Sequence, residues 1–92
     1  MKIIKTNLKG LLIVKQINNI DKRGQLRETF NDKILKKRFK FEYCTTSKSN
    51  ILRGFHFQTK YQQSKFVNVL KGKILDVVID LRKNSKTFGK TF

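Results

Sequence analysis

Residues 66–82 read FVNVLKGKILDVVIDLR, which is an apolar run, a Lys-Gly pair and a second apolar run. Apolar and β-branched runs on either side of a short turn are typical of a β-hairpin. The sequence therefore predicts strands over 66–70 and 73–81, joined by a tight turn at Lys71-Gly72.

This hairpin has two faces with different chemistry. If the turn has two residues, Lys65 and Asp76 are diagonal neighbours on one face, with α-carbons about 7–8 Å apart. A three-residue turn would change which residues of the two strands share a face, and would separate Lys65 from Asp76. Asp76 and Asp80 share that face, and such carboxylates in an apolar strand need partners or a wet cavity. The opposite face carries an apolar stripe of Leu75, Val77, Ile79 and Leu81.

Outward from the hairpin, other segments also have the alternation of short strands. We expect a half-buried strand at Phe39–Tyr43 and another at Ile51–Gln58. The pattern favours an all-β domain of sandwich or barrel type. Four further predictions concern the N-terminal part: an arm and first strand over 3–15, a loop with an Arg-Gly turn over 18–24, a short strand over 26–30, and one helical turn over 33–38 capped by Asn31-Asp32.

The 92 residues suit one small domain, with an N-terminal arm over about 1–15, core strands over about 26–82 and a polar tail over 83–92. A chain of this size buries only about 60–65% of its unfolded surface. It also has no Trp and no Pro. A partner chain or additional sequence is therefore expected to help complete the core.

The formal charge is +16, from 22 Lys and Arg against 6 acidic residues. This charge favours ligands that carry phosphate. A nucleic-acid surface is one interpretation, but the cations are scattered, no block exceeds Lys36-Lys37-Arg38, and no nucleic-acid-binding signature accompanies them. The alternative is a composition generally rich in lysine.

Cys44 is the only cysteine, so no internal disulfide can form and a reducing compartment fits. The N-terminus begins like a signal peptide, but the apolar run over 11–14 is too short for a signal peptide or a membrane span. We expect a cytoplasmic location and no membrane partner.

The only histidine, His56, lies three residues after Arg53. A regular strand would send the two side chains to opposite faces. They can share a pocket only if the strand is irregular, and Gly54 is the easiest place for a bulge. Spacing alone leaves two interpretations of His56: a hydrogen-bonded strand residue, or a general base.

Several motifs closely resemble the dTDP-4-dehydrorhamnose 3,5-epimerase family. They are, in order, DKRGQLRE at 21–28, LRGFHFQ at 52–58, QSKFV at 63–67, GKILDVVIDLR at 72–82 and SKTFGK at 85–90. The resemblance implies a cupin-like jelly roll (a double-stranded β-helix), usually dimeric. It also implies an isomerase that inverts C3 and C5 of dTDP-4-dehydro-6-deoxy-D-glucose, in dTDP-rhamnose biosynthesis.

The same resemblance assigns roles to six residues. His56 takes the place of the base that removes a proton next to the C4 ketone, and Lys65 and Asp76 belong with it in the catalytic group. The substrate-binding positions are Arg23, Glu28, Arg53 and again Lys65. No cofactor is implied, and with one histidine a conventional cupin metal site is not expected.

Family members are roughly twice as long, so the resemblance covers the first half of the barrel. The later strands, the general-acid tyrosine and the aspartate paired with the histidine have no counterpart here. We expect the 92-residue chain to be inactive alone and to form a homodimer or bind a complementary second half. Alternative functions are a C3-only epimerase, a sugar ketoisomerase, or a non-catalytic basic binding fragment.

Overall fold

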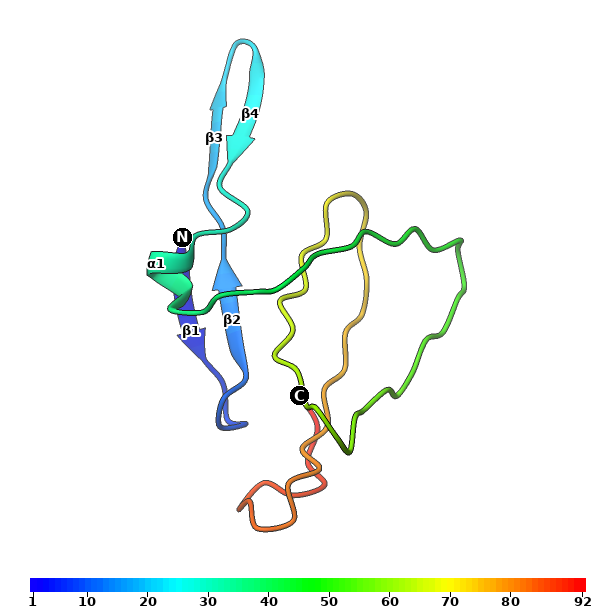
Figure 1. Ribbon diagram of the computed structural model, residues 1–92. Coiled ribbons are helices and arrows are strands. Elements are labelled where there is room, and N and C mark those ends of the chain that lie inside the picture. Colours follow the sequence, from blue (N-terminus) through cyan, green and yellow to red (C-terminus); the bar gives the residue numbers. More distant parts are fainter.

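The computed structural model describes residues 1–92. It contains two antiparallel β-hairpins followed by one helical turn (Figure 1). The first hairpin pairs β1 (Lys2–Lys5) with β2 (Leu12–Lys15), and the second pairs β3 (Asn18–Asp21) with β4 (Gly24–Arg27). The helix α1 covers Asp32–Leu35. The regular structure is thus nearly all β, which agrees with the predicted class.

The first hairpin follows from the β-branched residues at the centre of both strands. Ile3 pairs with Val14 and Ile4 with Ile13, so aliphatic side chains meet across the two strands. The connecting turn is held by Thr6, whose hydroxyl accepts a hydrogen bond from the Leu8 amide and lies within bonding distance of two carbonyls. Leu8 is the most buried apolar residue, at 2% exposure.

The second hairpin corrects the prediction of a loop over 18–24. Only Lys22 and Arg23 form the turn, and Asn18–Asp21 is strand β3. Asp21 explains the difference, because its carboxylate accepts a hydrogen bond from the Arg23 amide at 2.8 Å and closes the turn locally. The hairpin projects away from the rest of the molecule (Figure 1).

Helix α1 confirms the predicted cap. The Asn31 side chain accepts a hydrogen bond from the Ile34 amide at 3.1 Å, as an N-cap does. The helix starts one residue earlier than predicted and ends before Lys36, which has a left-handed φ of 53°. Left-handed backbone cannot continue an α-helix, so the predicted extension to Arg38 is wrong.

Replacing Asn31 with Ala should remove this cap. The loss of a cap acceptor costs about 1 kcal/mol, so the helical population over 32–35 should fall about fivefold. Backbone chemical shifts measured by NMR would report that population. Asn31→Asp keeps an acceptor oxygen and should retain the helix; equal helicity in the Ala and Asp variants would contradict the capping role.

The open region, residues 37–77, contains no strand and makes no backbone–backbone hydrogen bond (Figure 1). The strands predicted over 39–43, 51–58 and 66–70 are therefore absent as paired elements, and the one predicted over 73–81 is paired only from Val78 onward, with residues 90–92. The chain does bend over residues 70–72, where Gly72 has a φ of +89°, but no ladder forms beside this turn. A lone two-stranded hairpin is marginal in water without a third strand or a covering layer.

Residues 78–92 form a small closed unit. Val78 and Phe92 exchange two backbone hydrogen bonds, at 3.1 and 2.9 Å, and Ile79 forms an isolated bridge with Thr91. The Asp80 amide donates to the Lys90 carbonyl at 3.0 Å. The polar tail predicted for 83–92 therefore folds back onto the end of the preceding apolar run.

The core is small. Only Leu8 and Asp80 are buried, and the rings of Phe30, Phe39 and Phe66 pack together with centroids 5.8–6.3 Å apart. The radius of gyration is 15.5 Å, against roughly 12 Å for a compact domain of this length. The fold is open, and the helix α1, a single turn, is far too short to cross a lipid bilayer.

Candidate functional site

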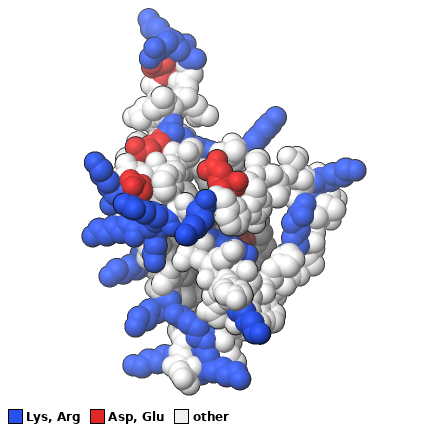
Figure 2. Space-filling model, viewed as in Figure 1, with Lys and Arg blue, Asp and Glu red and all other residues white.

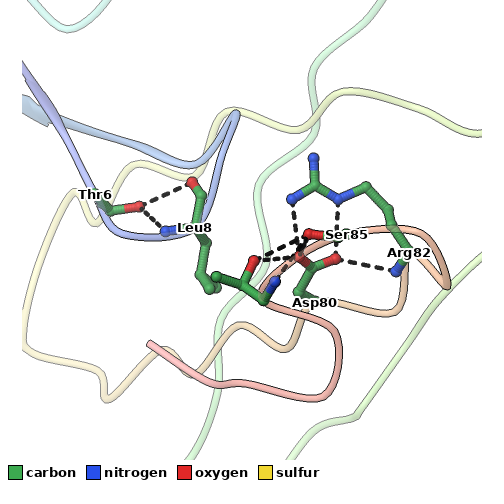
Figure 3. A network of polar contacts seen from close by, with 6 residues as sticks. Thr6, Leu8, Asp80, Arg82 and Ser85 are labelled. Carbon is green, nitrogen blue, oxygen red and sulfur yellow. Dashed lines mark hydrogen bonds and ion pairs between the residues drawn. The ribbon is translucent and has the colours of Figure 1, made fainter.

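Asp80 is the centre of the best-formed polar site (Figure 3). Its carboxylate accepts two hydrogen bonds from the Arg82 guanidinium, each at 2.9 Å, and one from the Arg82 amide at 3.0 Å. The hydroxyls of Ser85 and Thr87 each donate to the same carboxylate at 2.6 Å. We call these four residues the Asp80 cluster.

These contacts fix the charge of the cluster. The Arg82 guanidinium, followed by the two hydroxyls, holds the pKa of Asp80 far below its usual range. Asp80 in turn raises the pKa of Arg82. A carboxylate that is 5% exposed and accepts five hydrogen bonds has little capacity left to bind a ligand or take up a proton. Asp80 therefore holds the 78–92 unit together.

Ser85 and Thr87 are the residues of this cluster that pattern reasoning missed. The signal in the sequence is an aspartate near the end of an apolar run, followed two, five and seven residues later by Arg82, Ser85 and Thr87. Such hydroxyls after an aspartate are typical of a side-chain-bonded turn. Leu8 reaches toward the cluster from the β1–β2 turn (Figure 3).

The two predicted substrate-binding residues of the N-terminal half lie in or after the second hairpin. Arg23 is at its tip, where the guanidinium forms an ion pair with Asp21 at 2.6 Å and lowers the pKa of that carboxyl. The Arg23 side chain is 90% exposed. Glu28 follows β4 and accepts a hydrogen bond at 3.0 Å from Asn31, the residue that caps α1.

Arg53 and His56 lie in the middle of the open region. The Nε of Arg53 donates to the Ser47 hydroxyl at 3.0 Å, whereas the outer nitrogens of its guanidinium make no hydrogen bond. His56 is exposed and makes no hydrogen bond or ion pair. Gly54 has a φ of +105°, so the backbone is irregular at the position where the sequence favoured a break. A Cβ at Gly54 would lie 3.5 Å from the His56 Nδ1, which places the glycine beside the imidazole.

Lys65 and Asp76 are both exposed, and no ion pair joins them. Their predicted approach as diagonal neighbours depended on a ladder across the 66–81 hairpin, and that ladder is not formed. The prediction is therefore wrong for this structure. Near Lys65, Asn68 and Val69 do contact the N-terminal part, through Gln16 at 3.4 Å and through Arg27 at 3.0 Å.

The six predicted residues thus come from three separate places: the second hairpin, residues 53–56, and the two runs on either side of the turn at Gly72. No hydrogen bond or ion pair joins any two of them. A shallow hollow of about 310 Å³ lies between the β1–β2 turn and residues 78–82, and another of about 470 Å³ lies at the tip of the second hairpin. Arg23 is the only predicted site residue that lines either of them.

Cationic side chains surround this open fold. In Figure 2, Lys and Arg project from most of the visible face, while acidic groups occupy only a few small patches. On this face the cationic side chains do not gather into a single basic groove. This excess of cations makes the whole molecule attractive to anions at long range.

Known proteins are similar to this chain over nearly its whole length. The family model described as dTDP-4-dehydrorhamnose 3,5-epimerase matches residues 5–92. A dTDP-4-dehydrorhamnose 3,5-epimerase of Methanothermobacter thermautotrophicus is 43% identical over 94 residues, which are 97% of this chain and 51% of that protein. The proteins of the same name from Shigella flexneri and Escherichia coli are 38% and 35% identical, over 98% of this chain and 54% and 52% of theirs.

The chain spans about half the length of these curated relatives. No solved structure gives a significant match. The match of the family model covers nearly every residue, and the identities extend over almost the whole chain. The chain therefore belongs to the dTDP-4-dehydrorhamnose 3,5-epimerase family.

Proposed function

We propose that this polypeptide forms part of a nucleotide-sugar epimerase that acts on dTDP-4-dehydro-6-deoxy-D-glucose at C3 and C5. The observation that carries the proposal is the ordered family match over residues 5–92, which includes every predicted site residue. The same match supports a cupin-like jelly roll as the complete fold. The lone, exposed Cys44 is compatible with work in the reducing cytoplasm.

In the proposed reaction, His56 acts as the general base. An imidazole nitrogen takes the proton from C3 or C5, and the electron pair of that C–H bond moves toward the C4 carbonyl to form an enolate. A proton derived from solvent then adds to the opposite face of the same carbon as the enolate collapses back to the ketone, which inverts the centre, and the imidazolium releases its proton to solvent. The free, exposed imidazole supports this role, because no protein group competes for its nitrogens.

In this proposal, two kinds of cationic side chain bind the substrate. The Lys65 ammonium donates to the enolate oxygen, where negative charge develops. The guanidinium groups of Arg53 and Arg23 grip the diphosphate, an anion whose oxygens match their paired donors. The contact of Arg53 with Ser47 supports this, since it orients the side chain through Nε and leaves the outer nitrogens for a ligand. Asp76 and Glu28 complete the proposed site.

A covalent fusion gives the most direct test. The chain would be joined to the part of the Methanothermobacter thermautotrophicus relative that it does not match, and incubated with the keto-sugar in D₂O. Deuterium at both C3 and C5 supports the proposal, and deuterium at C3 alone indicates a C3-epimerase. A 3-keto product would indicate a ketoisomerase. A folded fusion that leaves all sugar hydrogens unexchanged would overturn the function.

Arg53→Lys in that fusion should weaken substrate binding more than turnover. Lysine keeps the charge but cannot form two parallel bonds to a phosphate, so KM should rise roughly tenfold while kcat changes little. Steady-state kinetics would measure both constants. Arg38→Lys, which also lies in the open region but outside the proposed site, is the matched control. Equal KM values for the two variants would remove Arg53 from the diphosphate site.

A further inference from the structure

The hollow of about 310 Å³ between the β1–β2 turn and the Asp80 cluster is formed by ordered parts of the chain. Its two walls are residues 8–11 and 78–82, and none of the six predicted site residues lines it. The hydroxyl of Thr6 fastens the first wall, and backbone hydrogen bonds close the 78–92 unit that carries the second. The side chains on these walls are therefore presented to the hollow from fixed backbone.

Arg82 brings a fixed and only partly used guanidinium to this hollow. Its Nε and Nη2 each donate a hydrogen bond to the Asp80 carboxylate at 2.9 Å. A guanidinium has five N–H donors, so three remain, and two of these lie along the Nη1–Nη2 edge. Nη1 makes no hydrogen bond and points away from Asp80 (Figure 3), and the side chain is 53% exposed. Paired donors held in one orientation match two oxygens of a phosphate group.

Lys9 supplies a second cation from the opposite wall. Its side chain is exposed and makes no hydrogen bond or ion pair. The next residue, Gly10, has a φ of +90° and no atom within 4 Å of the place that a Cβ would take, so the turn leaves open space beside Lys9. The only acid in residues 1–20 and 77–92 is Asp80, which is already paired. The hollow therefore favours an anion.

The rest of the lining is apolar, which indicates what else the ligand carries. Leu11, Ile79 and Leu81 line the hollow, and Leu81 is 46% exposed. A bare inorganic ion gains nothing from these side chains, whereas an organic group removes their apolar surface from water. We propose that the hollow binds a small organic phosphate, whose phosphate group contacts Lys9 and Arg82 and whose apolar part covers the three aliphatic side chains. A chain without epimerase activity would keep this site.

An NMR titration of the full 92-residue chain with phenyl phosphate tests this, with inorganic phosphate and phenol as matched probes. Phenyl phosphate should shift the backbone amides of 8–11 and 79–82 and the Nε–H of Arg82. Its Kd should be roughly 1 mM, because the site is open to water. Inorganic phosphate should shift the same amides with a Kd roughly five- to tenfold higher, since it leaves the apolar lining uncovered. Phenol at the same concentration should leave them unshifted.

Substitutions at Lys9 locate the site. Lys9→Gln removes one charge and disturbs no contact within the chain, so the Kd for phenyl phosphate should rise roughly fivefold. Lys9→Arg keeps the charge and should bind as the unmodified chain does. Lys15→Gln is the matched control, because it removes the same charge at the far end of the same hairpin, where Lys15 pairs with Lys2. This variant should also bind normally.

Four results would overturn the proposal. The first is the absence of shifts over 8–11 and 79–82 at millimolar phenyl phosphate. The second is equal binding of phenyl phosphate and either matched probe. The third is equal weakening by Lys9→Gln and Lys15→Gln, which would indicate general attraction to the charge of +16. The fourth is a set of shifts confined to residues around Arg23 and Arg53, which would support the proposed epimerase site and leave the hollow without a ligand.

Discussion

His56→Ala, introduced into the fusion with the unmatched part of the Methanothermobacter thermautotrophicus relative, should slow deuterium incorporation at C3 and C5 by roughly 10²–10⁴-fold. This is the usual contribution of a positioned general base. The KM should change little, because binding of the substrate diphosphate is assigned to Arg53 and Arg23. The loss would therefore fall on kcat, as expected for a group that acts in the transition state.

Added imidazole distinguishes a base from a structural residue. His56 is exposed and lies beside Gly54, which has no side chain, so removal of the imidazole leaves room for a free one. Millimolar imidazole should restore part of the exchange in His56→Ala and have no effect on the unmodified fusion. Phe57→Leu, which follows His56 in the chain but lies outside the proposed site, serves as the control and should keep most of the activity. Undiminished exchange in His56→Ala would show that another group is the base.

Local chemistry in this chain is readable from the sequence. The Asn31 cap, the break at Gly54 and the turn over Gly72 each depend on the residues immediately around them, and the structure contains all three. The loop predicted over 18–24 is wrong for residues 18–21, because Asp21 closes a tighter turn than the composition indicated. Short-range geometry was thus predictable in part: the end of α1 before Lys36 and the side-chain bonds of Asp21 and Asp80 were not.

Pairing over longer distances was not predictable in the same way. The pattern of residues 66–82 predicts a hairpin, but a two-stranded hairpin is marginal in water, and this one lacks a turn-closing side-chain bond such as that of Asp21 in the β3–β4 hairpin. The structure leaves Leu75 and Val77 uncovered, and the ladder is absent. The approach of Lys65 to Asp76 depended on that ladder, so it failed with it. The candidate site could be named residue by residue, whereas its assembly depended on strand pairing over residues 66–77 that the structure does not contain.

The Asp80 cluster gives the largest expected effect on stability. Asp80→Asn keeps the shape of the side chain but removes its charge, so the ion pair with Arg82 is lost and the remaining hydrogen bonds weaken. Native-state hydrogen exchange at Asp80, Gly89 and Phe92, whose amides close the 78–92 unit, would measure the effect. The protection factors at these amides should fall roughly 10–100-fold.

The matched control is Asp21→Asn, which removes the exposed ion pair with Arg23. Exposed pairs contribute little, so protection in the 78–92 unit should remain as it was. If both variants lose the same protection, general charge balance and not the buried cluster holds this unit together. If neither does, the hydrogen bonds to the Asp80 carboxylate are not what closes it.

Acid should reproduce the Asp80→Asn result without a substitution. Because the pKa of Asp80 is lower in the folded chain than in the unfolded one, the unfolded chain binds the proton more readily as the pH falls. The stabilisation by the carboxylate is therefore complete above the ordinary aspartate pKa of about 4 and declines progressively below it. Protection factors in the 78–92 unit should be constant from about pH 7 to 5 and fall below about pH 4. In Asp80→Asn that acid dependence should be largely absent, since the group that titrates has been removed; an equally steep fall in the variant would assign the acid sensitivity to another carboxyl.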